Sequence, residues 1–261
     1  MEVIVAEDYE DMSARAASIV LSALNQNPQI VLGLATGSTP VGLYERMIEA
    51  EDNGEADFSG VTTYNLDEYV GLSPDHEQSY RYFMNDNLFD HIGIPEENTH
   101  VPDGLAEDLG AHCKEYEQMI RNAGGVDLQV LGIGRDGHLG FNEPGSSLSG
   151  RTQVVALAPE TIEDNARFFD SEEEVPRFAV TMGIRTIMDA GLCLMLASGE
   201  SKADAVRDAV EGPVSASCTA SALQMHPSAV VIIDEAAGSR LERLEYYKWA
   251  HEAKQEIADR L

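Results

Sequence analysis

The stretch VDLQVLGIGRDGHLGFNEPG, residues 126–145, joins a short apolar run to a glycine-rich loop. The run, residues 126–134, has the composition of a strand that is buried on both faces of a parallel sheet. The loop after it carries Asp136, His138 and Glu143 close together. Three titratable side chains in a turn contribute little to packing but can transfer protons. The stretch therefore predicts a parallel sheet with a site at the carboxyl end of this strand.

Comparable apolar runs recur along the chain, at residues 30–37, 61–69, 192–199 and 229–235. Helical patterns lie between or after them, at residues 41–50, 80–92, 200–212 and 241–261. This alternation predicts an α/β fold, an open, mostly parallel sheet with helices on both faces in a Rossmann-like three-layer sandwich. Because no internal repeat, low-complexity linker or block of charge divides the chain, we expect a single domain over residues 1–261.

The composition limits the class of protein and its partners. The chain has 261 residues, of which 43% are hydrophobic, so it can bury a full core. It shows neither a long apolar span nor the features of a signal peptide, and we expect a cytoplasmic protein. The net charge of −29, with 46 acidic and 17 basic residues, excludes nucleic acid and anionic membranes as partners. Carboxylates spread over the whole chain, with only four lysines, also predict a halophilic protein from a high-salt cytoplasm.

The loop ATGSTP, residues 35–40, has the features of a phosphate site. Ser38 and Thr39 supply hydroxyls, and Gly37 lets the backbone approach a ligand. The helix that opens at Pro40 presents free N–H groups. The loop matches neither a Walker A sequence nor G-x-G-x-x-G, so an ordinary capped turn remains the alternative.

Two basic residues are candidates for binding the same phosphate. Lys202 lies at the start of the helical pattern 200–212, where a positive charge opposes the helix dipole and needs another reason to be present. Arg167 stands beside an aromatic pair and can bind a phosphate through two hydrogen bonds. The alternatives are a solvated surface lysine and an arginine that neutralises nearby carboxylates.

Asp67 and Glu68 stand side by side where the apolar run 61–69 ends. Neighbouring side chains on an extended segment point in opposite directions, so only one is expected to face the crevice beyond the carboxyl ends of the strands, where we expect the loops to converge. A carboxylate against an apolar wall is a natural general base, whereas a carboxylate that caps backbone N–H groups is the alternative.

Three readings of the Asp136, His138 and Glu143 cluster are open: an acid–base relay, a metal site and a polar turn. The relay is favoured because a histidine between carboxylates can pass protons near neutral pH. The cysteines, Cys113, Cys193 and Cys218, are scattered and at no metal-ligand spacing, so we expect no metal and structural thiols in a reducing compartment.

The whole pattern resembles the glucosamine-6-phosphate deaminase (isomerase) family, within the glucosamine-6-phosphate isomerase/6-phosphogluconolactonase superfamily. The blocks that carry the resemblance are LGLATGSTPVGLYE, NLDEYVGL, SYRYFM, LGIGRDGHLGFNEPGSSLSGRT, NARFF, GESKADAVRDAVEG and SALQMHPSAVVIIDE, in this order. It implies conversion of D-glucosamine 6-phosphate and water to D-fructose 6-phosphate and ammonia, without a metal or organic cofactor.

The resemblance also implies a role for each candidate residue. Asp67 corresponds to the base that moves a proton between C2 and C1, and His138 to the group that assists ring opening. Asp136 and Glu143 correspond to the carboxylates that support it. The sugar phosphate is expected on the loop Thr36, Gly37, Ser38 and Thr39, with Arg167 and Lys202.

The sequence departs from the family at one place. Some members are activated by N-acetylglucosamine 6-phosphate through an arginine and a lysine, where this chain has Gln153 and Val155, although Ser146 and Ser147 remain. We therefore expect no such activation. Whether the chain forms a homo-oligomer is left open.

Two other functions fit parts of the pattern. The first is a 6-phosphogluconolactonase, but those enzymes typically continue DGHTASLFP, whereas this chain reads DGHLGFNEP with Glu143 and keeps NLDEY. The second is a non-catalytic sugar-phosphate sensor, which usually carries a DNA-binding segment or lacks acid–base residues. The chain shows no basic helix-turn-helix pattern, so we favour the enzyme.

Overall fold

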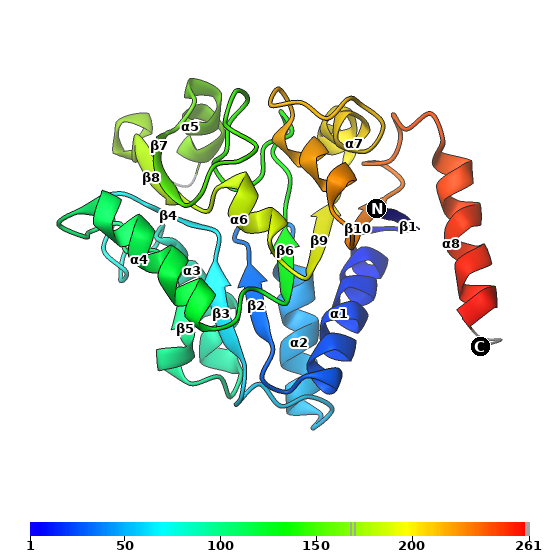
Figure 1. Cartoon of the computed structure of the whole chain (residues 1–261), viewed down its shortest axis with the longest axis horizontal. Helices are drawn as coiled ribbons and strands as arrows, with labels where there is room; N and C mark the ends of the chain where they lie inside the picture. The colour runs from blue at the N-terminus through cyan, green and yellow to red at the C-terminus, as the bar shows by residue number, and fades with distance from the viewer. Residues whose placement is uncertain (168, 170, 259–261) are drawn as a thin grey trace.

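The computed structural model describes residues 1–167, 169 and 171–258. Its centre is a seven-stranded sheet with the order β1-β10-β9-β6-β2-β3-β5, in which all neighbouring strands run parallel (Figure 1). The strands are β1 (Glu2–Ala6), β2 (Val31–Leu34), β3 (Thr62–Asn65), β5 (Thr99–His100), β6 (Leu128–Leu131), β9 (Leu192–Ala197) and β10 (Ala229–Asp234). The predicted parallel sheet is confirmed.

Helices cover both faces of this sheet. They are α1 (Tyr9–Gln26), α2 (Val41–Asp52), α3 (Tyr80–Asn87), α4 (Leu109–Asn122), α5 (Pro159–Ala166), α6 (Ile184–Met188), α7 (Ala203–Val210) and α8 (Leu244–Ala258). Side chains of β9 alternate between two buried clusters: Met195 lies in the cluster that contains α4, α6 and α7 residues, and Leu194 in the one that contains α1, α2 and α3 residues. A continuous apolar run therefore packs into a core on each face of the sheet. Helices must cover both cores, and this is the physical reason for the three layers.

A second, three-stranded antiparallel sheet was not predicted. It has the order β4-β8-β7 and consists of β4 (Asp67–Tyr69), β7 (Gln153–Ala156) and β8 (Phe178–Thr181). The predicted strand 61–69 is in fact two strands that part at Leu66. The N–H of Leu66 donates to the carbonyl of Leu34 in the large sheet, and its own carbonyl accepts from the N–H of Met182 beside the small one. Asp67 therefore lies directly beyond the carboxyl end of β3.

Several predicted helices are shorter than their apolar patterns. The pattern 80–92 gives α3 and then a 3-10 turn, Phe89–His91. The pattern 200–212 begins as a 3-10 turn, Glu200–Lys202, before α7. Of the pattern 241–261, residues 244–258 form α8, and residues 259–261 lie outside the described part. None of the helices described is long and apolar enough to span a membrane.

Candidate active site

The strand order brings the predicted loops to one edge of the sheet. Strands β9, β6, β2 and β3 are successive parallel neighbours, and their arrowheads point to the same, upper edge in Figure 1. The residues that follow these strands along the chain are, in the same order, Lys202, the loop with His138, the loop 36–39 and Asp67. A direct contact links the first two, because Nζ of Lys202 donates to the carbonyl of Ile133 at 2.7 Å. The expected convergence on one edge is therefore seen in the topology.

The His138 ring lies between two carboxylates. Its Nδ1 atom is 2.8 Å from Oδ1 of Asp136 and 3.1 Å from Oε2 of Glu143. The ring packs on the backbone of Gly134, where a Cβ atom would lie 2.5 Å from Nε2, so this position requires a glycine. Since Nδ1 is engaged by both acids, Nε2 is the nitrogen that can exchange a proton with another molecule.

The two acids keep the imidazole charged. Burial alone would lower the pKa of His138, but hydrogen bonds and charge from Asp136 and Glu143 outweigh it and raise the pKa to about 9. Burial also tends to raise the pKa of Asp136, yet its contacts with His138 bring that pKa down to about 2. The pKa of Glu143 is likewise lowered, because His138 and Thr161 outweigh its burial. At neutral pH the cluster is one imidazolium between two carboxylates.

Glu143 is held by α5, a contact that the sequence did not predict. Its Oε1 atom accepts from the Thr161 hydroxyl at 2.6 Å and from the Ala158 N–H at 3.3 Å. The only sequence signal was the helix start at Pro159, which locates a helix N-terminus but does not say what it binds. Thr161 is therefore a residue of the site that sequence reasoning missed.

Asp67 is buried against the loop that carries His138. Asp67 is only 6% exposed. A Cβ atom placed on Gly140 would lie 3.2 Å from Oδ2 of Asp67. Burial and the charge of Glu68 raise the pKa of Asp67 to about 7, while His138 opposes the rise. A carboxylate that titrates near neutral pH is well matched to taking and returning a proton.

The neighbouring Glu68 has a different environment. Its carboxylate accepts N–H bonds from Tyr69, Tyr80 and Arg81, at 2.8, 2.9 and 3.0 Å, and so caps the start of α3. Glu68 thus has the capping role that the sequence analysis gave as the alternative for a carboxylate at this position, and the role of Asp67 as the base stays a prediction.

An aromatic cluster lies beside Asp67. The Tyr69 ring is 4.9 Å from Tyr80 and 5.6 Å from Phe141, and Phe169 packs edge-on at 6.1 Å. The Tyr80 and Phe141 rings stack 6.1 Å apart and 8° from parallel. Burial next to Asp67 raises the pKa of Tyr80 well above its ordinary value, so the phenol stays neutral. These rings belong to one apolar cluster, which packs against the strand that carries Asp67.

The loop Thr36, Gly37, Ser38 and Thr39 follows β2, beside the end of β6. Gly37 adopts φ +91°, with no atom within 4 Å of a Cβ placed there, so its backbone faces open space. The Ser38 carbonyl is fixed by the Tyr9 hydroxyl at 3.0 Å. Arg167 directly follows α5, and its role in binding phosphate stays a prediction.

The side chains of Asp136, His138 and Glu143 are also close enough together to bind one metal ion. One ligand atom each from Asp136, His138 and Glu143 lie within 4.8 Å of one another. A metal needs an unprotonated nitrogen, whereas Nδ1 is already within hydrogen-bond distance of both carboxylates. The contacts therefore favour the proton relay over a metal centre.

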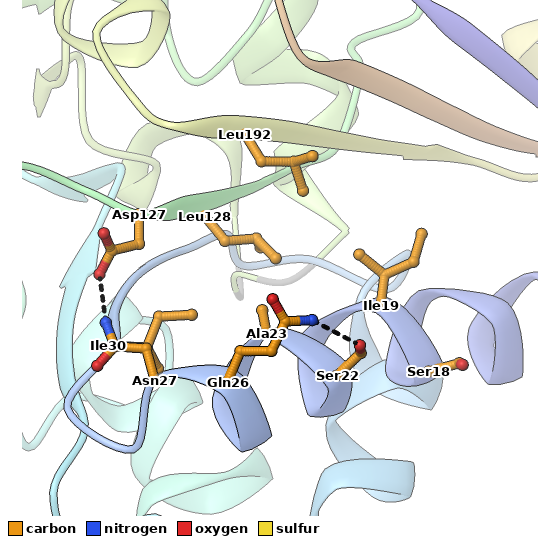
Figure 2. Close-up of a pocket in the computed structure, with 10 residues that line it drawn as sticks. All are labelled: Ser18, Ile19, Ser22, Ala23, Gln26, Asn27, Ile30, Asp127, Leu128 and Leu192. Atoms are coloured by element: carbon orange, nitrogen blue, oxygen red, sulfur yellow. Dashed lines mark hydrogen bonds between the residues drawn. The ribbon is translucent and has the colours of Figure 1, made fainter. Parts of the chain in front are cut away.

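A separate hollow of about 530 Å³ lies at the opposite edge of the sheet (Figure 2). It is lined by Ser22 and Gln26 of α1 and by Leu128 and Leu192, the first residues of β6 and β9. Ligands of open parallel sheets bind beyond the carboxyl ends of the strands, so this hollow is not the candidate site.

Comparison with known proteins identifies the family of this chain. The model of the family described as glucosamine-6-phosphate isomerases/6-phosphogluconolactonase matches residues 6–235. The chain belongs to this family. The resemblance deduced from the sequence blocks is thus confirmed, and so is the fold class.

Individual relatives separate the two branches of the family. A glucosamine-6-phosphate deaminase of Shewanella loihica is 53% identical over 261 residues, which cover 100% of this chain and 97% of the relative. The solved structure of a monomeric glucosamine-6-phosphate deaminase has a TM-score of 0.90 at 46% identity, covering 92% of this chain and all of that one. A 6-phosphogluconolactonase from Leishmania guyanensis has a TM-score of 0.73 at 25% identity, covering 91% and 97%. The chain is more similar to the deaminases.

Proposed function

We propose that this protein is a glucosamine-6-phosphate deaminase, which converts D-glucosamine 6-phosphate and water to D-fructose 6-phosphate and ammonia. The observation that carries the proposal is the pairing of two proton-transfer groups at one sheet edge. Burial and the charge of Glu68 raise the pKa of Asp67 to about 7, and contacts with Asp136 and Glu143 raise the pKa of His138 to about 9. One is a base and the other an acid at the same pH, which is what an isomerising deamination needs. Similarity to deaminases over the whole chain supports the same conclusion.

The first step is opening of the sugar ring. The His138 imidazolium gives its Nε2 proton to the ring oxygen, and the C1 hydroxyl gives a proton back to Nε2, so that the C1 carbonyl forms and the imidazolium is restored. Asp136 and Glu143 hold the imidazole ring of His138 in place and keep it charged, through their contacts with its Nδ1 atom. After the proton has left Nε2, the two carboxylates favour its return.

The second step moves a proton from C2 to C1 of the open chain. Asp67 removes the C2 proton, which is acidified by the neighbouring carbonyl, and an enolamine forms. Return of the proton to C1 gives the imine at C2. Water then adds to C2 and ammonia leaves, so that a C–N bond is replaced by the carbonyl of the ketose. Water is consumed in this balance, and we therefore class the reaction as a hydrolytic deamination coupled to isomerisation.

The phosphate end of the substrate would be bound by the loop Thr36–Thr39 with Lys202 and Arg167. Lys202 supports this role because its ammonium group donates to the carbonyl of Ile133, just beyond β6 at the start of the loop that carries His138. Binding energy from a phosphate remote from C1 and C2 can hold the sugar in register during both proton transfers. The proposed partner is thus a small sugar phosphate.

We further propose that residues 1–261 act as one domain, in a cytoplasm of high salt. The charge of −29 supports the salt adaptation, because its self-repulsion is screened at high ionic strength. A urea midpoint that rises steeply from dilute buffer to molar KCl is expected, and a flat response would contradict it.

The deciding experiment measures ammonia and fructose 6-phosphate released from glucosamine 6-phosphate in molar KCl. Equal amounts of both products are expected from the wild type, and none from Asp67→Asn. Folding of the variant is checked by circular dichroism. Folded wild-type protein that releases no ammonia, but hydrolyses 6-phosphogluconolactone, would instead assign the lactonase activity of the other branch.

A further inference from the structure

Glu68 is the most deeply buried carboxylate beside the candidate base, and the proposed reaction does not use it. The residue is 3% exposed and belongs to β4, next to Asp67. Three backbone N–H groups donate to its carboxylate, from Tyr69 on its own strand and from Tyr80 and Arg81 in the first turn of α3. Such a set of donors, with no acceptor among them, fits a carboxylate and not a protonated acid.

The two adjacent acids therefore have opposite environments. Burial raises the pKa of Glu68 above its ordinary value, and the three backbone N–H groups and the Arg81 charge limit this rise by stabilising the carboxylate. Within residues 1–167, 169 and 171–258, no group donates a hydrogen bond to the Asp67 carboxylate, which lies against Gly140. When two neighbouring acids compete for one proton, the acid without donors holds it.

We propose that Glu68 is a positioning residue for the deaminase reaction: its carboxylate, held by three backbone N–H groups, fixes β4 on the start of α3 and places a negative charge next to Asp67. The inference rests on the proposed function, since it assigns to Asp67 the role of proton carrier. This role acts through Asp67 and requires no contact between Glu68 and the substrate.

The other groups around Asp67 do not supply this charge. Tyr69 on the same strand, Tyr80 of α3 and Tyr116 of α4 interact with Asp67, and burial raises the pKa of each phenol, so all three are neutral. His138, from the loop after β6, is positive and acts in the opposite direction. Among the described groups, Glu68 is the anion that acts on Asp67.

The test is the pH dependence of kcat/KM for ammonia release by Glu68→Gln. Removing the neighbouring charge makes Asp67 easier to ionise, so the acid limb of the profile is expected to move to lower pH by about one unit. Glu68→Asp retains the charge but shortens the reach to α3, and is expected to keep the acid limb while kcat falls.

Glu117→Gln is the matched control. Glu117 is also buried and accepts hydrogen bonds from the N–H and hydroxyl of Thr152, yet it is not among the charges that act on Asp67. The acid limb of the Glu117→Gln pH profile is expected to coincide with that of the wild type. A shift in this control equal to that of Glu68→Gln would overturn the proposal, because any loss of a buried carboxylate would then have the same effect.

A second readout does not depend on turnover. Carboxyl carbon NMR of ¹³C-aspartate-labelled protein gives the titration of Asp67 directly, assigned by its loss in Asp67→Asn. A folded Glu68→Gln protein in which this titration is unmoved overturns the inference.

If Glu68→Gln does not fold, the Glu68→Asp variant decides, and wild-type kcat and KM in that variant would contradict the positioning role. Wild-type protein without ammonia release would refute the proposed function alone, since the NMR comparison still stands.

Discussion

Nδ1 of His138 lies 3.1 Å from Oε2 of Glu143, and the other oxygen of Glu143 is held by α5. Glu143→Gln removes one of the two charges that raise the pKa of His138. The imidazolium is then expected to lose its proton about one pH unit earlier. The alkaline limb of the kcat profile should move to lower pH by that amount, and histidine NMR should show the same shift. An unmoved limb would remove Glu143 from the relay.

Stability should also depend on the charge of His138. Its pKa is about 9 in the folded protein, against an ordinary value of 6.5. Because the pKa is raised on folding, the charged His138 adds its full contribution to the free energy of unfolding below pH 6.5. This contribution is lost as the pH rises through about 9. The size of the shift corresponds to about 3 kcal/mol at most. Urea unfolding at pH 6 and pH 10 measures the loss, which should be smaller in His138→Gln. Equal losses in both proteins would mean that other groups are responsible.

Gly140 is expected to tolerate no side chain. It adopts φ +57°, and a Cβ atom there would lie 2.8 Å from Oγ1 of Thr181 and 3.2 Å from Oδ2 of Asp67. Gly140→Ala should therefore displace the Asp67 carboxylate and lower kcat by about a hundredfold, since small displacements of a reacting group cost that much.

Gly145→Ala is the control for Gly140→Ala. Gly145 also has positive φ, at +99°, but nothing lies within 4 Å of its Cβ position. It should show only the backbone strain of about 1 kcal/mol in unfolding free energy, with kcat little changed. Similar kcat losses in both variants would point to strain in the loop and not to contact with Asp67.

Lys202→Gln tests the phosphate site. A charged hydrogen bond to a ligand contributes about 1.5–3 kcal/mol, so KM for glucosamine 6-phosphate should rise about ten- to hundredfold. The change in kcat should be small, because this contact is equally present in the ground state and the transition state. Lys248→Gln is the control, since Lys248 pairs with Glu235 on the surface. An unchanged KM in Lys202→Gln would place the phosphate elsewhere.

The kinetics should be insensitive to N-acetylglucosamine 6-phosphate. Gln153 and Val155 lie on β7 and carry no positive charge that could bind the phosphate of this sugar. Rates against substrate concentration should therefore be hyperbolic, with and without the acetylated sugar. Sigmoidal rates that become hyperbolic on its addition would contradict this expectation.

The parallel sheet and the site edge followed from the sequence because both depend on local pattern. A short apolar run such as 229–235 is long enough for one buried strand, and parallel strands place all their carboxyl ends together. Asp136, His138 and Glu143 are close along the chain, so their contact needed only one loop to fold. Their order and spacing also carried the family resemblance.

The small antiparallel sheet and the strength of the base were decided by tertiary structure. The run 61–69 reads as one strand, and only the separate contacts of Leu66 with Leu34 and Met182 divide it. Thr161 reaches Glu143, and Gly140 meets Asp67, across stretches of chain whose length says nothing about contact. The sequence determined which acids and bases are present, because residue types and local spacing are written in it. Which acid holds its proton at neutral pH depends on burial and on distant N–H donors, and these exist only once the chain has folded.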